Sequence, residues 1–206
     1  MIQKRTSLKD HGFSLIELIV VIVVIGILAA ITIVSYNGIQ TRATNTSRAT
    51  EVRKYADLIT LYQATLRKFP AAPDVADIPN GTYCLGTGFP QSPSNPSVRT
   101  CRNWTQTPGT SVTPTEASSA RLMEELAKVG TVSSENHNNT SDPVIGPYIQ
   151  IHSDRVVVTT ILSGKNQAVC DEFKVKLDTT NPDDMGWDGF AATGKPLQSC
   201  GVIIAR

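Results

Sequence analysis

An unbroken apolar run near the N-terminus, Phe13–Val34, constrains the fold of this chain more than any other feature. The run is 22 residues long and contains a single charged residue, Glu17. A helix of this length measures about 33 Å, enough to span a hydrocarbon core of about 30 Å. Valine and isoleucine dominate the run and favour strands in water, but in lipid each backbone group must bond within its own segment. The sequence therefore predicts a membrane-spanning helix.

The segment before the apolar run is basic. Lys4, Arg5 and Lys9 are opposed only by Asp10 over residues 1–12. The positive-inside rule keeps such a segment in the cytoplasm, so the C-terminus is expected on the other side of the membrane. A cleaved secretory signal has an apolar core of about 7 to 15 residues followed by a small-x-small site, and this run does not fit that pattern.

Glu17 is the residue of the run that requires a functional explanation. A carboxylate so close to the start of a membrane-length stretch is costly. An ionisable residue at such a depth is by default a functional-site hypothesis whose partner has to be named. An ordinary membrane anchor has no use for this charge.

The residues around Glu17 resemble the type IV pilin family, which includes the pseudopilins of type II secretion. The resemblance covers residues 9–40 and rests on the run from Gly12 to Glu17 and on Gly26 with the four residues after it. It implies cleavage after Gly12 by a prepilin peptidase and N-methylation of Phe13, the new N-terminus. It also implies a pilin-like fold and a role for Glu17 in setting the register of assembly.

Cleavage after Gly12 would create a positive amino group on Phe13, one helical turn from Glu17. The two groups can pair within one chain or between neighbouring chains, and either pairing offsets the cost of a buried charge. One position departs from the family pattern, because Val34 stands where many members have a proline that loosens the helix. Gly38 is a candidate substitute hinge, since glycine costs about 1 kcal/mol relative to alanine in a helix.

A second helical pattern continues the membrane helix as far as Phe69. Residues at a three- or four-residue spacing predict an amphipathic helix with one buried stripe, with two tyrosines beside it: Val52, Ala56, Ile59, Gln63, Leu66 and Phe69, with Tyr55 and Tyr62. Phe69 precedes Pro70, and a residue before proline leaves the helical region. The predicted organisation is a cleaved basic leader (1–12), a transmembrane and assembly helix (13–34), an amphipathic half (35–69) and a globular head (70–206).

The head is predicted to combine one short helix with an antiparallel sheet. Residues 70–112 are rich in proline and glycine and are expected to be mostly loop, with a short strand at 82–85. Thr113, Pro114 and Glu116 form a capping-box pattern that predicts a helix through Val129, stopped by Gly130. Strand patterns at 148–152, 155–162, 169–177 and 202–205, with turns at 153–154 and 163–166, predict a meander. The expected fold class is α+β, with the long helix packed on the C-terminal sheet.

Four cysteines lie in the exported part of the chain: Cys84, Cys101, Cys170 and Cys200. They allow three pairings. Cys84–Cys101 and Cys170–Cys200 are favoured because each pair closes a local loop rich in glycine, proline and asparagine. The first loop contributes about 3 kcal/mol on the chain-entropy model. A metal site is the weaker interpretation, since no C-x-x-C pair is present and no histidine flanks the cysteines.

No catalytic set, metal site or cofactor is predicted. The sequence lacks G-x-S-x-G, P-loop and H-E-x-x-H motifs, and its net charge of +1 shows no basic excess for general nucleic-acid binding. Asp178, Asp183, Asp184 and Asp188 are interpreted as a solvated loop, because their spacing is not that of an EF-hand. A calcium site on these oxygen-rich residues is the weaker alternative. Other candidates are interpreted as surface or packing residues: His137, His152, Trp104, Trp187 and Phe190.

The predicted function is that of a structural subunit of a type IV pilus, used for adhesion, motility or DNA uptake. Expected partners are other pilin subunits, prepilin peptidase, the assembly platform of the cytoplasmic membrane and, before assembly, membrane lipid. The expected location is the cytoplasmic membrane, as a single-pass protein with its C-terminus outside, and then the extracellular pilus. Two alternatives stay open. One is a pseudopilin of a type II secretion or competence machine. The other is a membrane-anchored binding domain that never polymerises and keeps the Gly12–Phe13 bond uncut.

Overall fold

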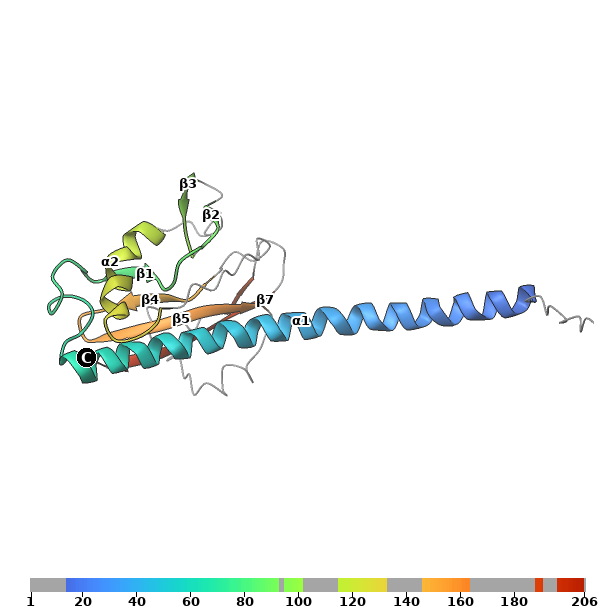
Figure 1. The fold of residues 1–206 in the computed structure, drawn as a ribbon, viewed down its shortest axis with the longest axis horizontal. Coiled ribbons are helices and arrows are strands. Elements are labelled where there is room, and N and C mark those ends of the chain that lie inside the picture. Colours follow the sequence, from blue (N-terminus) through green and yellow to red (C-terminus); the bar gives the residue numbers. More distant parts are fainter. Residues whose placement is uncertain are drawn as a thin grey trace, which may run out of the picture. The chain divides into compact units, whose positions relative to one another are not determined.

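The computed structural model describes residues 14–92, 95–101, 115–132, 146–163, 188–190 and 196–205, with the backbone alone at 33–37, 163, 188–190 and 196–199. The chain divides into two compact units, Met1–Arg42 and Ala43–Arg206. The long helix α1, Leu15–Leu66, contributes to both units (Figure 1).

Helix α1 runs without interruption from Leu15 to Leu66, through Val34 and Gly38. Its valine- and isoleucine-rich part is helical, as the argument from backbone hydrogen bonding predicts. The helix ends three residues earlier than predicted, because Arg67 adopts a left-handed conformation with φ 53° and donates its N–H to the Gln63 carbonyl (3.0 Å). This is the αL termination motif, in which the left-handed residue is usually glycine.

Five strands of the second unit form an antiparallel sheet in the order β1-β4-β5-β7-β6. The strands are β1 (Gly81–Cys84), β4 (Tyr148–Ile151), β5 (Arg155–Ser163), β6 (Asp188–Phe190) and β7 (Pro196–Ala205). A tight turn at 153–154 joins β4 to β5, and across it His152 donates its N–H to the Arg155 carbonyl (2.9 Å). This hairpin confirms the predicted strands and turn.

Other strand predictions were less accurate. The predicted strand at 202–205 is the end of the longer β7, which pairs with β5 from Leu197 to Ala205. Strand β6 was not predicted. The predicted strand at 169–177 and most of the turn at 163–166 lie outside the described residues. The α+β class is nevertheless confirmed, since an N-terminal helix combines with an antiparallel sheet.

Helix α2, Glu116–Ala127, starts with a different cap from the predicted one. Its N-cap is Thr115, whose side chain accepts from the Ser118 N–H (3.0 Å), while Ser118 Oγ accepts from the Thr115 N–H (3.0 Å). The predicted cap at Thr113 with Glu116 was wrong. Glu116 instead contacts a loop that is distant in the sequence: its Oε2 accepts hydrogen bonds from the N–H groups of Gly88 and Phe89 (3.1 and 3.2 Å).

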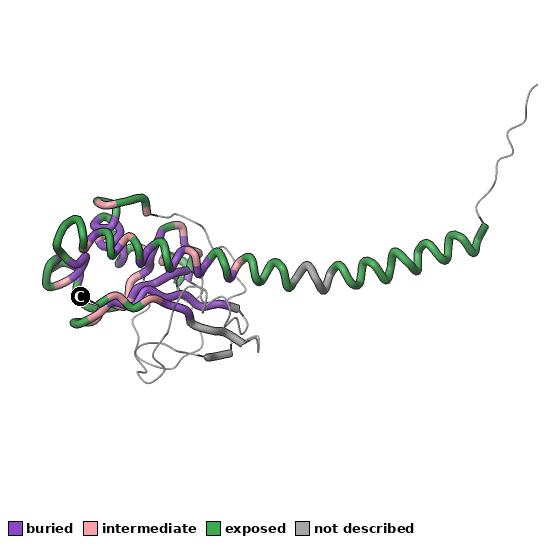
Figure 2. Tube along the Cα trace, turned by 90° about the horizontal axis from the view of Figure 1, so that it is seen from below, coloured by how far each residue is buried: buried purple, intermediate pink, exposed green. Residues whose placement is uncertain are grey.

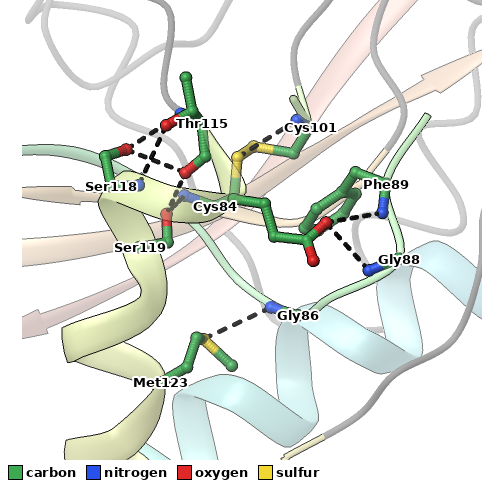
Figure 3. Close-up of a disulfide and its surroundings, with 10 residues drawn as sticks. Cys84, Gly86, Gly88, Phe89, Cys101, Thr115, Ser118, Ser119 and Met123 are labelled. Atoms are coloured by element: carbon green, nitrogen blue, oxygen red, sulfur yellow. Dashed lines mark hydrogen bonds between the residues drawn. A yellow bond between two sulfur atoms is a disulfide. The ribbon is translucent and has the colours of Figure 1, made fainter. Parts of the chain in front are cut away.

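A small hairpin was missed within the stretch predicted as loop. It consists of β2 (Gln91–Ser92) and β3 (Asn95–Arg99). A disulfide between Cys84 and Cys101 joins the end of β1 to the residues just after β3 (Figure 3). Beside it the Cys84 N–H donates to Ser119 Oγ (2.6 Å), which ties β1 to α2.

The main core of the second unit is formed by α1, α2 and one face of the sheet. Figure 2 shows buried segments gathered in this unit. The core confirms the predicted stripe at Val52, Tyr55 and Ile59, whereas Leu66 is 38% exposed. The residues that meet this stripe come from every layer of the unit: Leu122, Met123 and Leu126 from α2, Ile149 and Ile151 from β4, and Val156 and Val158 from β5.

Candidate processing and assembly site

The start of α1 places Glu17 in a capping arrangement. The Ser14 N–H donates to Glu17 Oε2 (2.8 Å), and the Leu18 N–H donates to the Ser14 carbonyl (3.2 Å). A glutamate at the third helical position that accepts from the N-cap amide is one half of a capping box. The carboxylate thereby satisfies one of the donors that a helix start leaves without an intrahelical partner. Gly12 and Phe13 lie outside the described residues.

The surface that follows Glu17 is apolar and uncovered. The helical segment Leu15–Thr32 has a mean hydropathy of 3.0 over 18 residues, and none of it is buried within the chain. The exposed fractions of its large apolar residues range from 47% at Ile19 to 75% at Leu15. Figure 2 shows this part of α1 as exposed. An apolar surface of this size has to be covered by lipid or by other chains. Its length and composition suffice for one membrane span.

The polar groups of this segment differ in whether they need a partner from the surrounding lipid or from a neighbouring chain. Thr32 is satisfied within the helix, since its hydroxyl donates to the carbonyls of Leu28 (2.6 Å) and Ala29 (3.1 Å). Gly26 faces open space, because a Cβ added to it would meet no neighbouring atom within 4 Å, so another helix can approach closely there. Glu17 is the ionisable side chain of Leu15–Thr32 that lipid or a neighbouring chain must accommodate.

Comparison with protein families matches residues 7–33 to the prokaryotic N-terminal methylation motif, the hallmark of type IV pilin and pseudopilin prepilins. The matched segment contains Gly12, Phe13 and Glu17. The motif implies processing by prepilin peptidase and assembly with other pilin-like subunits, and it marks structural pilin-type proteins rather than an enzyme family. No curated protein and no solved structure matches the chain. The motif and the apolar helix together fit a membrane-anchored precursor of the pilin or pseudopilin type.

The cysteine predictions are confirmed for the first pair. Cys84 and Cys101 are both fully buried and form the disulfide that the loop argument favours. Cys200, in β7, is also disulfide-bonded. Its predicted partner, Cys170, lies outside the described residues, so the second pairing stays a prediction.

The remaining candidates supply no second site among the described residues. His152 follows β4 at the hairpin turn, and no cluster of three or more metal-ligating side chains occurs in the described part of the chain. Phe190 and the last aspartate of the cluster, Asp188, lie in β6. The other candidates lie outside the described residues: His137, Trp104, Trp187, Asp178, Asp183 and Asp184.

Sequence reasoning missed a set of buried charged residues in the second unit. Arg48, Glu51 and Glu125 are 1%, 2% and 3% exposed. Arg48 NH1 donates to the Ile161 carbonyl (3.1 Å), within the buried part of the unit. The spacing indicated that Arg48 is buried, because it lies four residues before Val52 and so continues the buried stripe of α1. The charge of these residues argued against burial, since charged residues are rarely buried unless they are paired.

Glu125 is the centre of a charged network that joins α1 to α2. Its Oε2 accepts from the Tyr62 hydroxyl (2.7 Å), and its Oε1 contacts Lys128 Nζ and Arg121 NH2 (both 2.6 Å). Arg121 also bonds Asp77 Oδ2 (2.7 Å). The Lys128 ammonium, with Tyr62 and Arg121, lowers the pKa of Glu125 to about 2 against the opposing effect of burial. Burial and the neighbouring carboxylate raise the pKa of Tyr62 to about 12, so its hydroxyl keeps the proton it donates.

Proposed function

We propose that this chain is a structural subunit of a type IV pilus, made as a membrane prepilin and polymerised through its N-terminal helix. A single observation carries the proposal: α1 combines a fully exposed apolar surface with a carboxylate in its first turn, within an N-terminal methylation motif. Prepilin peptidase would cut the Gly12–Phe13 bond, and the new amino group of Phe13 would be methylated.

Assembly would move α1 out of the lipid phase and into the core of a fibre. Lipid tails are as apolar as leucine, so moving α1 from lipid to a fibre core gains little from the hydrophobic effect. Association then depends on close packing and on polar contacts between helices. Glu17 supplies the polar group, and the Phe13 amino group of a neighbouring subunit is its proposed partner. An unpaired charge is costly away from water, so the pairing would favour one register of assembly.

The expected path of the chain follows from this role. The basic leader, residues 1–12, would stay in the cytoplasm, and the head would lie outside the cytoplasmic membrane. The assembly platform of that membrane would then draw the processed chain out of the lipid and into an extracellular pilus. The head would form the fibre surface and with it any adhesive contact, or any contact used in motility or DNA uptake.

Mass spectrometry of sheared surface filaments tests the proposal. We expect an abundant chain that begins at methylated Phe13. A Glu17→Ala variant should still be inserted and cleaved but should be absent from filaments, whereas Thr32→Val, a substitution in the same helix, should be incorporated normally. A processed chain that never appears in surface filaments would support the pseudopilin alternative. An intact Gly12–Phe13 bond would overturn both.

A further inference from the structure

A groove of about 830 Å³ lies between α2 and β3 in the second unit. Ala117 and Ala120 line it from α2, and Val98 lines it from β3. Met123 also lines it and accepts a hydrogen bond from the Gly86 N–H at its sulfur (3.5 Å; Figure 3). The lining is mostly apolar and its alanines are small. An apolar side chain placed in the groove would therefore be stabilised by its removal from water.

Charged groups lie at two levels along this groove. The residue before α2 pairs antiparallel with the residue after β3, which sets Arg99 beside Glu116, the first residue of α2. Arg99 lines the groove and donates to the Phe89 carbonyl (2.6 Å), but it has no ion pair within the described part of the chain. Glu124 lies about two turns farther along α2, with Ala120 midway between. The groove therefore presents a cation, an apolar hollow and a carboxylate at steps of about 6 Å.

The outer face of α1 presents a matching order of groups at the same steps. Leu61 is 48% exposed, the highest value for a large apolar residue among the described residues of the second unit. Asp57 lies one turn before it and Thr65 one turn after it, and both are exposed. Neither side chain forms a hydrogen bond or ion pair within the described residues. This outer row of α1 thus offers an anion, an apolar side chain and a hydroxyl about 6 Å apart.

We propose that the outer row of α1 (Asp57, Leu61 and Thr65) docks in the α2–β3 groove of a second copy of this chain. Leu61 of one copy fills the hollow at Ala120 of the other, and Asp57 pairs with Arg99. The third step brings the Thr65 hydroxyl to the carboxylate at the far level of the groove. The two helices then run in the same direction, with their rows of every fourth residue facing each other.

Glu116 is the group that opposes this arrangement, since its carboxylate lies beside Arg99. Its Oε2 is already bound by the N–H groups of Gly88 and Phe89 (3.1 and 3.2 Å). Oriented backbone amides contribute positive partial charge, so they offset part of its repulsion of Asp57. Arg99 keeps donors for Asp57, because its bond to Phe89 uses NH1 alone.

The outer row and the groove belong to different sides of the second unit. Figure 1 shows β3 and α1 on opposite sides of β4 and β5. A contact between two different surfaces is heterologous, so each copy uses its row on one neighbour and its groove on the next, and the contact repeats along an open chain or a ring. The inference rests on the proposed function, because a fibre is such a repeating assembly.

The proposed contact is small. One helical row in a groove falls below the roughly 1,000 Å² that a stable interface buries. It becomes effective where assembly through the apolar segment Leu15–Thr32 holds neighbouring copies close together, because linked contacts act at a raised effective concentration.

Oxidative cross-linking of the full chain tests this contact. The double variant Leu61→Cys with Ala120→Cys carries both halves of the contact, so disulfides between copies should give a ladder of dimers, trimers and larger species on non-reducing gels. Each single variant should give dimers at most. The matched control replaces Thr60 instead of Leu61, because Thr60 is exposed but lies about 100° away around the helix. The assay is run on sheared surface filaments and on the purified chain in detergent micelles.

Charge reversal in the cross-linking variant tests the pairing of Asp57 with Arg99. Asp57→Arg should lower the ladder yield about threefold or more, because attraction at an exposed pair becomes repulsion. Adding Arg99→Asp should restore the yield to within about twofold of the unreversed variant. If the reversed pair does not fold, Asp57→Asn replaces it and should give a yield between those of the parent aspartate and Asp57→Arg.

The outcomes separate this inference from the proposed function. Filaments that give no ladder would overturn the contact and leave the proposed function standing. A charge-dependent ladder in micelles from a chain that never forms filaments would support the contact and contradict the proposed function. The inference is also overturned by the absence of a ladder in both preparations, by an equal ladder from the Thr60 control, or by a yield that charge reversal does not change.

Discussion

Replacing Glu125 by glutamine tests how much the buried charge contributes to the stability of the head. Glutamine keeps the shape and can still accept the Tyr62 hydrogen bond, but it removes the negative charge that Lys128 and Arg121 face. We expect Glu125→Gln to lower the free energy of unfolding at pH 7. The variant isolates the charge because the hydrogen-bond acceptor survives.

The size of the effect follows from the pKa of Glu125. Its pKa falls from 4.5 to about 2 in the folded chain. At about 1.4 kcal/mol per pKa unit, this corresponds to roughly 3 kcal/mol of preference for the ionised form. The side chains of Arg121 and Lys128 are 41% and 52% exposed, so solvent screens their charges. A loss of about 1–2 kcal/mol is therefore expected.

The loss should depend on pH in one direction. Folding lowers the pKa of Glu125, so the stability from its charge is complete above about pH 4.5 and is lost as the pH falls toward 2. Glutamine does not titrate in this range. The difference in unfolding free energy between the parent and Glu125→Gln should thus be constant from pH 7 to pH 5 and should shrink toward zero near pH 2.

Urea unfolding of residues 43–206, the second compact unit, measures this difference at several pH values. The matched control is Glu124→Gln, because the neighbouring Glu124 is 70% exposed and its contact with Arg121 is long (3.4 Å). The control should change stability by less than about 0.5 kcal/mol at any pH. A loss for Glu125→Gln that is the same at pH 7 and pH 2.5 would refute the electrostatic argument.

Two further substitutions test backbone geometry by the same unfolding assay. Arg67→Gly should stabilise the second unit by about 0.5–1 kcal/mol, because a left-handed conformation costs an L-residue more than glycine, whereas Arg67→Ala should not stabilise it. Gly201→Ala should destabilise it by about 1–3 kcal/mol, because the new Cβ would lie 2.7 Å from the Val158 carbonyl oxygen and 2.8 Å from Thr159 Cβ. Gly81→Ala is the control for the second substitution, since its nearest neighbour would be the Tyr83 ring at 3.7 Å. A neutral Gly201→Ala would show that β5 and β7 tolerate a wider separation than the structure gives them.

Local patterns were sufficient to predict the elements whose stability is local. The β4–β5 hairpin was predicted from strand alternation and a two-residue turn, and α1 from the length and periodicity of its apolar residues. The end of α1 was predicted too late because Pro70 sets only the furthest point that the helix can reach, which is Phe69. The actual stop is the left-handed Arg67, which no propensity rule assigns to arginine.

Elements held by distant contacts could not be predicted in the same way. The β2–β3 hairpin lies in a proline-rich stretch, and the loop before it is fixed by Glu116 from α2 and by Arg99, which donates to the Phe89 carbonyl (2.6 Å). The same distant contact explains why the cap of α2 was predicted at the wrong residues. Glu116 accepts hydrogen bonds from the loop, and Ser118 forms the cap with Thr115 instead. The buried Arg48 and Glu125 were missed for a related reason. Their partners, a β5 carbonyl and a tyrosine hydroxyl, lie more than 60 residues away in the sequence.

The candidate site at the start of α1 could be proposed from the sequence because its residues are neighbours in the chain. A single substitution at Glu17 can therefore separate the two properties of that residue. Glu17 has two separable properties: an acceptor that bonds the Ser14 amide and a negative charge. Glutamine preserves the first and removes the second, because both glutamate and glutamine complete a capping box. If pairing with the Phe13 amino group drives assembly, Glu17→Gln should be cleaved normally yet be as absent from filaments as Glu17→Ala. Filaments built from Glu17→Gln but not from Glu17→Ala would show that the cap, and not the charge, is what assembly requires. A carboxylate offers about four lone-pair sites, so the cap and the amino group of a neighbour can be accepted together.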